Sequence, residues 1–442
     1  MSGRYKAYPE YKNSGVEWLG EIPLDWSMWK LAHAYNEIGS GTTPPTNNEE
    51  WFKGNVPWVT TGELREKIIT DTKKKLSNEA LNTYPTLRKH PVGSIAIAMY
   101  GATIGRLGIF GLEATTNQAC CVMGASQQIK NKYLFYWLWA FKEDIIRLSS
   151  GGGQPNINQE KVASLKISAP EVSEQQKIAN FLDHETAKID TLIAKQEKLI
   201  ELLKEKLQAV ISHAVTKGLN PNAPMKDSGV EWLGEVPEHW EMKKLKYIGE
   251  AKNGLTYSPD NVVAESEGVL VLRSSNIQNA SLSFNDNVYV NIDIPERIKT
   301  KKDDLLICSR NGSRKLIGKN ALITEGAAGM AFGAFMVIYR SPINPYLFWI
   351  FNSPLFEYQS GSFLTSTINQ LTIGNLDSME VPLPPSNEQE MIKKYLVNKN
   401  QYFDALTAKS KLKVKLLVER KTALISAAVT GKIDVRDWQG EA

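Results

Sequence analysis

Basic, amide and hydroxyl side chains gather in the loops of two parts of the chain, residues 22–172 and 236–386. Such side chains read the edges of nucleic-acid bases: arginine can hold guanine, and asparagine or glutamine can hold adenine, through paired hydrogen bonds. Glycines in several of these loops let a backbone approach a phosphate closely. We predict nucleic-acid contact for these loops, while a merely solvated loop is the alternative for each one. The candidate contacts are Thr60, Thr61, Lys73, Lys74, Tyr100, Thr103, Gln154, Asn156, Arg273, Ser274, Asn276, Arg310, Asn311, Ser313, Arg314, Lys315, Thr367, Asn369 and Gln370.

Catalytic signatures are missing from the sequence. It contains no G-x-x-x-x-G-K-[ST] phosphate loop and no Asn-Pro-Pro-aromatic segment, and the Gly39-Ser40-Gly41 turn lacks the rest of a dinucleotide fingerprint. The five histidines have no metal-ligand spacing, and the acidic residues form no compact pair. We therefore expect no catalytic residue, no metal site and no cofactor bound by this chain.

Composition sets the broad class. The chain has 442 residues, of which 42% are hydrophobic and 23% charged, so it can build two to four cores of ordinary size. Three cysteines without C-x-x-C spacing, two of them adjacent, favour a reducing, cytoplasmic location. The N-terminal segment is polar and aromatic, which does not fit a signal peptide, and no apolar stretch approaches the roughly 20 residues of a membrane span.

The sequence contains an internal repeat that divides it into two halves. The segment SGVEWLGE occupies residues 14–21 and again residues 228–235. The match continues beyond it, since Trp26 in the first half corresponds to Trp240 in the second. The offset of 214 residues between these two copies also relates Glu174-Gln175 to Glu388-Gln389. Between these matching segments the two halves differ in sequence. We expect this of a repeated scaffold that carries two domains of different specificity.

A long amphipathic helix is predicted at the end of each half, over 174–217 and 388–432. Neither stretch contains proline, and apolar residues recur at seven-residue spacing, which is typical of a coiled-coil seam. Each helix needs a partner for its apolar stripe; we expect the other helix, and packing on its own domain is the alternative. The second helix has ten Lys or Arg against four Asp or Glu, and the first has seven of each. The predicted seam residues are Leu182, Ile189, Leu192, Leu199, Leu203, Val210, Leu396, Phe403, Leu417 and Leu424.

Mixed structure is predicted between these helices. Short apolar runs at 94–99 and 304–308 read as buried strands, and aromatic helices are expected at 131–148 and 344–360. The predicted fold class is α+β: two mixed α/β domains joined by two long, antiparallel, coiled-coil-like helices with internal pseudo-two-fold symmetry. The predicted boundaries are 1–173 and 219–387 for the two domains, 174–218 and 388–432 for the helices, and 433–442 for a C-terminal tail.

This order of elements resembles the specificity subunit of type I restriction–modification enzymes. The resemblance is carried by the S-G-V-E-W-L-G-E-[IV]-P-x-x-W opening of both halves, the E-Q-x-x-I-x-x-x-L start of each long helix and the A-V-T near each helix end. It implies that each domain is a target recognition domain for one half of a split, asymmetric DNA sequence. It further implies that the helices set the spacer between the halves.

The resemblance also implies partners. Two copies of a methyltransferase subunit, which uses S-adenosylmethionine to methylate adenine, would dock on the helices. A motor-nuclease subunit that uses ATP and Mg²⁺ would join them for restriction, and this chain itself would be non-catalytic. The competing interpretation is a structural scaffold that binds proteins or peptides and no DNA.

Overall fold

The computed structural model describes residues 5–148, 156–230, 232–363 and 369–440. The chain folds as two compact units, Met1–Gln196 with Leu412–Ala442, and Glu197–Lys411. Both long helices, α6 (Val172–Lys217) and α10 (Ser386–Val429), therefore contribute one part to each unit. No helix among the described residues is long and apolar enough to cross a membrane.

The first unit is built on a five-stranded mixed sheet in the order β4-β11-β8-β9-β6. Neighbouring strands are antiparallel except β6 and β9, which are parallel. A smaller sheet, β10-β5-β7, contains a parallel pair as well. The strands of these sheets are β4 (Ile38–Ser40), β5 (Val56–Val59), β6 (Lys67–Ile69), β7 (Lys75–Leu76), β8 (Ile95–Ala98), β9 (Leu107–Phe110), β10 (Thr115–Thr116) and β11 (Cys120–Met123).

Two antiparallel strand pairs frame the first domain. One pair joins β1 (Tyr11–Asn13) to β2 (Glu21–Pro23). The other joins β3 (Ser27–Lys30), where the chain enters the domain, to β12 (Lys166–Ala169), directly before α6. The shorter helices of this unit are α1 (Leu31–Ala34), α2 (Asn78–Thr83), α3 (Asn131–Ala140), α4 (Lys142–Arg147) and α5 (Gln159–Ser164).

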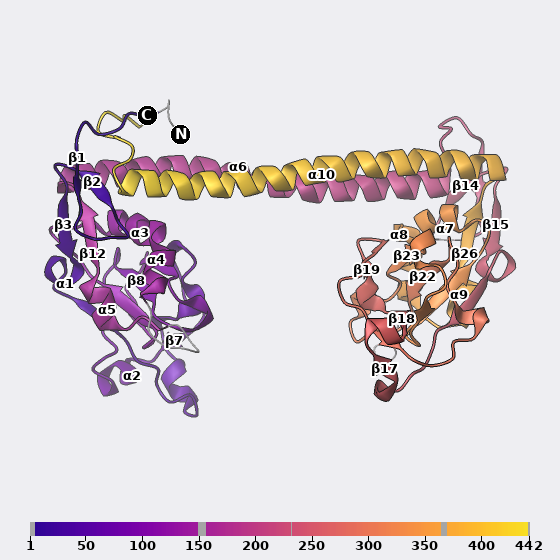
Figure 1. Ribbon diagram of the computed structural model, residues 1–442, viewed down its shortest axis with the longest axis horizontal. Helices are drawn as coiled ribbons and strands as arrows, with labels where there is room; N and C mark the ends of the chain where they lie inside the picture. The colour runs from indigo at the N-terminus through magenta and orange to yellow at the C-terminus, as the bar shows by residue number, and fades with distance from the viewer. Residues whose placement is uncertain (1–4, 149–155, 231, 364–368, 441–442) are drawn as a thin grey trace. The chain divides into compact units, whose positions relative to one another are not determined.

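Helix α3 occupies the centre of the first unit. Residues 133–138, four of them aromatic, are all buried, because the helix packs in one cluster with the sheet and with α6 (Figure 1). A helix that is apolar all round is stable only when it is covered on all sides.

The second unit repeats this plan with two four-stranded sheets, β16-β25-β22-β23 and β17-β21-β18-β24. Strands β18 and β24 are parallel, as β5 and β10 are in the first unit. The strands of these sheets are β16 (Glu250–Asn253), β17 (Val262–Val263), β18 (Val269–Leu272), β21 (Tyr289–Val290), β22 (Leu305–Cys308), β23 (Asn320–Leu322), β24 (Ala331–Phe332) and β25 (Met336–Arg340). The remaining strand pairs are β13 (Met225–Asp227) with β14 (Glu235–Pro237), β15 (Glu241–Lys244) with β26 (Glu380–Leu383), and β19 (Ile277–Gln278) with β20 (Ser281–Leu282).

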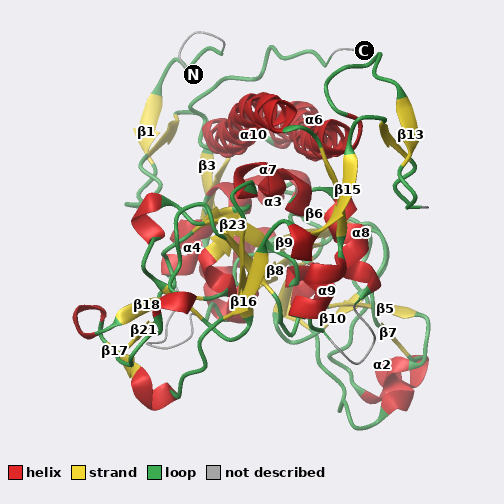
Figure 2. Cartoon of the chain, turned by 90° about the vertical axis from the view of Figure 1, so that its right-hand side faces the viewer, coloured by secondary structure: helices red, strands yellow, loops and turns green. Residues whose placement is uncertain are grey.

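The shorter helices of the second unit are α7 (Asn344–Phe351), α8 (Pro354–Ser362) and α9 (Ile373–Ser378). Helix α7 lies between the long helices and the sheet, like α3 in the first unit (Figure 2). The expected single helix over 344–360 is two helices, because Pro354 disfavours helical geometry at the extended Ser353. The expected helix over 131–148 is likewise divided, at Phe141.

The long helices pair antiparallel in the first unit. Asp190 of α6 binds Lys421 of α10 at 2.7 Å, and Lys177, further toward the start of α6, binds the carbonyl of Arg436 beyond the end of α10. In the second unit, Leu207 and Val210 of α6 pack in one cluster with Ile392 and Leu396 of α10. In each unit, both helices therefore bury apolar side chains against each other and against the domain of that unit.

The predicted repeat is confirmed in the backbone. Strands β1, β2, β3 and β12 recur in the second half of the chain as β13, β14, β15 and β26, and α5 recurs as α9. The predicted buried strands at 94–99 and 304–308 are β8 and β22, all of whose residues are buried.

Candidate nucleic-acid interface

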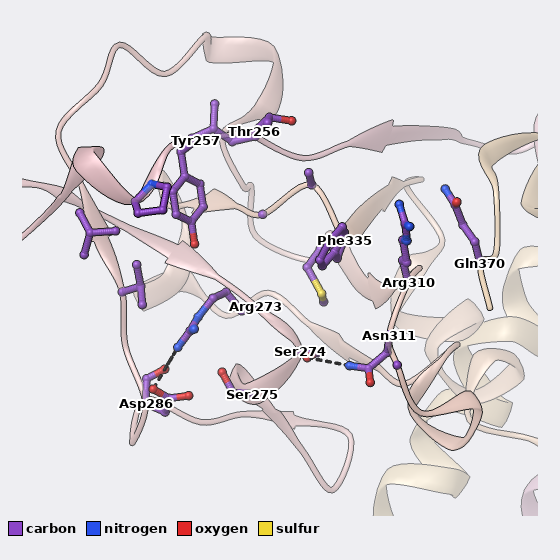
Figure 3. A pocket seen from close by; sticks show the side chains of 18 of the residues that line it. Thr256, Tyr257, Arg273, Ser274, Ser275, Asp286, Arg310, Asn311, Phe335 and Gln370 are labelled. Carbon is purple, nitrogen blue, oxygen red and sulfur yellow. Dashed lines mark hydrogen bonds and ion pairs between the residues drawn. The ribbon is translucent and has the colours of Figure 1, made fainter. Parts of the chain in front are cut away.

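A hollow of about 1370 Å³ opens at one edge of the sheets in the second domain (Figure 3). It lies where β18 and β22 end. The segment from β16 to β17, the turn between β24 and β25 and the segment before α9 complete its wall. Six residues predicted from the sequence line it: Arg273, Ser274, Arg310, Asn311, Asn369 and Gln370.

Arg310 is the exposed guanidinium of this hollow. It lies over the ring of Phe335, with 5.3 Å from its guanidinium carbon to the ring centroid. Its backbone N–H donates to Phe335 O at 3.1 Å, and an isolated antiparallel bridge joins Arg310 to Gln370. In Figure 3 the side chains of Arg310 and Gln370 lie next to each other and point the same way. The arrangement offers the guanidinium fork and the amide side by side.

Arg273 is restrained by Asp286. Its Nη2 lies 2.9 Å from Asp286 Oδ1 and donates to Asp286 O at 3.3 Å. The backbone N–H of Arg273 donates to Asn276 Oδ1 at 2.9 Å, which caps the 3-10 turn Ser274–Asn276. Arg273 thus lines the hollow with its charge already matched by a carboxylate.

Asn276 corrects the sequence prediction, because its side chain is 0% exposed. Its Nδ2 lies within hydrogen-bond distance of Ser283 O, Asp286 O and Asn287 Oδ1, at 3.0 to 3.2 Å. A side chain whose hydrogen-bonding groups are satisfied internally is not offered to a base. Asn276 therefore holds the loop that carries Arg273 and does not face the hollow.

The remaining predicted residues of this domain divide into two sets. Asn311 donates to Ser274 Oγ at 3.2 Å, which ties the loop after β22 to the loop after β18. Ser313, Arg314 and Lys315 are exposed but are not among the residues lining the hollow, and Arg314 donates to Gly361 O at 3.1 Å. Thr367 lies outside the described residues.

In the first domain, Thr60 ends β5 as Arg273 ends β18. The Glu63 carboxylate accepts hydrogen bonds from the Thr60 N–H at 2.7 Å and from the Lys73 N–H at 2.7 Å. It thereby holds together two of the predicted loops. Thr61 begins the 3-10 turn that Thr60 caps, and Lys74 is exposed with its Nζ 5.3 Å from the centroid of the Phe52 ring.

Tyr100 and Asn156 form the counterpart of Arg310 and Gln370. An isolated antiparallel bridge joins them, although they lie far apart in the sequence. Thr103 lies in the 3-10 turn that directly follows Tyr100. Gln154 lies outside the described residues.

The two domains therefore present different side chains on one backbone plan. Thr60 with Glu63 corresponds to Arg273 with Asn276, since in each pair the side chain three residues later accepts a hydrogen bond from the backbone N–H of the residue that follows a matching strand. The sequence prediction named the bridge residues of both domains without pairing them, and it missed Phe335, Asp286 and Glu63. A carboxylate at the third position after Thr60 was the sequence signal for the hydrogen bond between Thr60 and Glu63.

The predicted helix seam is found in part. Leu182, Ile189, Leu396, Phe403, Leu417 and Leu424 are buried, and Leu203 and Val210 are half-buried. Leu192 and Leu199 are each 41% exposed, which corrects the prediction that their row is buried. A helix paired with one partner covers a single stripe of its surface, and this row lies outside that stripe.

The three cysteines are buried, and burial makes their thiols harder to ionise. Burial raises the pKa of the Cys121 thiol to about 12 and also raises the pKa values of Cys120 and Cys308. Over the described residues, no group of three or more His, Cys, Asp or Glu side chains could hold a metal ion.

These features define a class: a tandem recognition protein with two similar domains, each followed by a long helix and each with its own set of polar side chains at one sheet edge. The chain belongs to the type I restriction modification DNA specificity domain family, whose profile matches residues 25–202 and again 237–416. The chain thus carries the DNA specificity domain twice.

Known proteins agree with this assignment. The type I restriction enzyme MjaVIII specificity subunit of Methanocaldococcus jannaschii is 24% identical over 427 residues, covering 94% of this chain and 95% of that protein. A chain solved in a study of complex assembly in the type I R-M system covers 93% of this chain and 99% of its own length, with a TM-score of 0.73 and 16% identity. The HsdS subunit from Thermoanaerobacter tengcongensis covers 93% and 98%, with a TM-score of 0.52 and 15% identity. At these identities, the two structures show the fold.

Proposed function

We propose that this chain is the non-catalytic, sequence-reading subunit of a type I restriction–modification complex, and that each domain reads one half of a bipartite, asymmetric DNA site. The observation that supports this most is the matched pair of bridges, Tyr100–Asn156 and Arg310–Gln370. One backbone position carries a phenol in one domain and a guanidinium in the other. Different hydrogen-bonding groups at one geometry select different bases.

The exposed basic side chains nearby suit the phosphates that flank such bases. Lys73 and Lys74 are exposed beside the Thr60 loop, and Arg314 and Lys315 are exposed beside Arg310. Phosphate contacts position a protein on a duplex, while base contacts specify the sequence. We assign these four residues the positioning role.

The long helices would fix the spacer between the half-sites and dock two methyltransferase subunits. Exposed leucines on α6, Leu192, Leu199 and Leu202, support the docking role, because an exposed apolar row on a long helix suits a protein partner. S-adenosylmethionine would bind to those subunits for adenine methylation, and ATP and Mg²⁺ to a motor-nuclease subunit. With DNA as its ligand, the complex would act in the cytoplasm.

A domain exchange tests the proposal. Residues 22–172 are replaced by the corresponding domain of another specificity subunit, and the modified adenines are mapped genome-wide in cells that also carry the methyltransferase gene. We expect one half of the methylated sequence to change and the other half to persist. A change in both halves, or in neither, would contradict the assignment of one reader to each domain.

Duplex binding across salt concentrations separates this function from a protein scaffold. The complex should bind a duplex with the sequence that it methylates more tightly than unrelated duplexes. This binding should weaken steeply as the salt concentration rises. A complex that binds no duplex at low salt would favour the scaffold.

A further inference from the structure

We infer that the half-site of the second domain contains a guanine read by Arg310. This rests on the proposed function and deepens it, since it assigns a base to one residue of the interface.

Arg310 is the arginine whose charge is available in the hollow. Arg273, the other arginine of its lining, is bound to Asp286 through both an ion pair at 2.9 Å and a carbonyl contact. Within the described part of the chain no carboxylate forms an ion pair with Arg310, and the residue is exposed. A guanidinium with unused donors is what a base with two acceptors requires.

The backbone at Arg310 is held from both sides. Its N–H donates to Phe335 O, and the next residue on each side is also fixed: Ser309 O accepts from Leu371 N–H at 2.7 Å, and Asn311 donates to Ser274 Oγ. Phe335, 58% exposed, holds the guanidinium by a cation–π contact. A planar fork that is already ordered loses less freedom when it binds.

The chemistry of the fork selects the base. Guanine presents two acceptors, O6 and N7, in the major groove, and arginine contacts both with parallel N–H groups. The first domain has Tyr100 at this place, and a phenol has no such fork. At this matched position, the guanine requirement therefore belongs to the second domain and not to the first.

The experiment uses the complex of the full chain with its methyltransferase subunit and compares Arg310→Ala and Arg310→Gln with the unmodified chain. Methylation is measured by genome-wide adenine mapping and on duplexes that carry each base pair at each position of the half-site. We expect Arg310→Ala to lose at least about tenfold of the discrimination at one G·C pair. Arg310→Gln should shift the preference there from guanine toward adenine, because glutamine pairs with adenine N6 and N7.

Arg314→Ala is the matched control. Arg314 is an exposed arginine of the same loop that is not among the residues lining the hollow. Because its proposed partner is a phosphate, its loss should lower methylation of all duplexes alike and leave the base preference unchanged. Thermal melting of each variant complex should match the unmodified complex, because Arg310 is a surface residue.

Three results would overturn the inference. The first is a half-site, preserved when residues 22–172 are exchanged, that contains no G·C pair. The second is a uniform fall in methylation of all duplexes by Arg310→Ala, which would make the partner a phosphate. The third is an Arg310→Gln complex that keeps its full preference for guanine. A wild-type complex that methylates no defined sequence would instead overturn the proposed function, and with it the assignment of Arg310.

Discussion

The indole Nε1 of Trp26 donates a hydrogen bond of 3.1 Å to Glu174 Oε1, which links the segment entering the first domain to the first turn of α6. Trp240 donates to Glu388 Oε2 at 2.9 Å in the same way at the matching place in the second half. The neighbouring Gln175 and Gln389 also match, since each donates to a proline carbonyl five residues earlier. The residues shared by the two halves thus close each domain onto the helix that leaves it.

Trp26→Phe should loosen this closure. A smaller aromatic ring remains at this fully buried site, and the bond to a carboxylate is lost; such bonds contribute about 2 kcal/mol. Glu174 keeps its second partner, the Tyr8 hydroxyl at 2.6 Å, so the domain should stay folded. Hydrogen exchange measured by mass spectrometry should show roughly tenfold or greater loss of protection at the start of α6.

Trp240→Phe is the matched control for that measurement. It should affect the start of α10 and leave the start of α6 unchanged, because Trp240 binds Glu388. If the two variants showed the same hydrogen-exchange protection at the starts of α6 and α10, the Trp26–Glu174 and Trp240–Glu388 bonds would not be what holds the helix starts.

Asn276→Ala should destabilise the loop that carries Arg273. The substitution removes the hydrogen bonds that Asn276 makes to the Arg273 N–H and to the carbonyls of Ser283 and Asp286, of which Asp286 O keeps the Arg273 guanidinium. Several lost bonds at a fully buried site should cost about 3 kcal/mol. Exchange should accelerate over residues 273–288, and the complex should methylate more slowly with an unchanged base preference. A changed preference without faster exchange would restore Asn276 as a base contact.

The sequence predicted the frame of this fold better than its site. The repeat at Trp26 and Trp240 was readable because both residues stand in matching segments of regular spacing. The exposure of Leu192 could not be predicted from the sequence. Heptad spacing shows that a helix has an apolar face, but it does not show how much of that face the partner helix covers.

The roles of the loop residues were harder to predict from the sequence than the buried faces of the helices. A polar residue after a strand can face solvent or cap its own turn, and Asn276 does the second while Arg310 does the first. The Tyr100–Asn156 bridge joins positions far apart in the sequence, so only the tertiary fold brings them together.

The first unit should lose stability as the pH falls below about 6.5, because of His90. Burial lowers the pKa of this imidazole, an effect that Arg88 adds to and Glu37 opposes. The unfolded chain then binds a proton that the folded chain resists, between the ordinary histidine pKa near 6.5 and the lower folded value. The stability present above pH 6.5 therefore falls toward the folded pKa, by up to about 1.4 kcal/mol per pH unit.

His90→Gln removes this titration. Thermal melting between pH 7.5 and 5.5 should show a smaller decrease for the variant than for the unmodified chain. His33→Gln, at an exposed histidine of the same unit, is the matched control substitution. Parallel profiles for the His90 variant and the unmodified chain would contradict the assignment.

The proposed spacer role of the helices predicts a defined change in the DNA site. Insertion of one heptad after Leu203 in α6 and another after Phe403 in α10 keeps the seven-residue register of both apolar rows. Seven helical residues add about 10.5 Å, which corresponds to about three base pairs at 3.4 Å each. Adenine mapping should then show both half-sites unchanged with a spacer about three base pairs longer. Insertion in α6 alone is the control: it leaves α10 too short to match its partner, and the complex should fail to assemble. A doubly inserted chain that methylates the original spacing at the original rate would exclude the helices as the element that sets the distance.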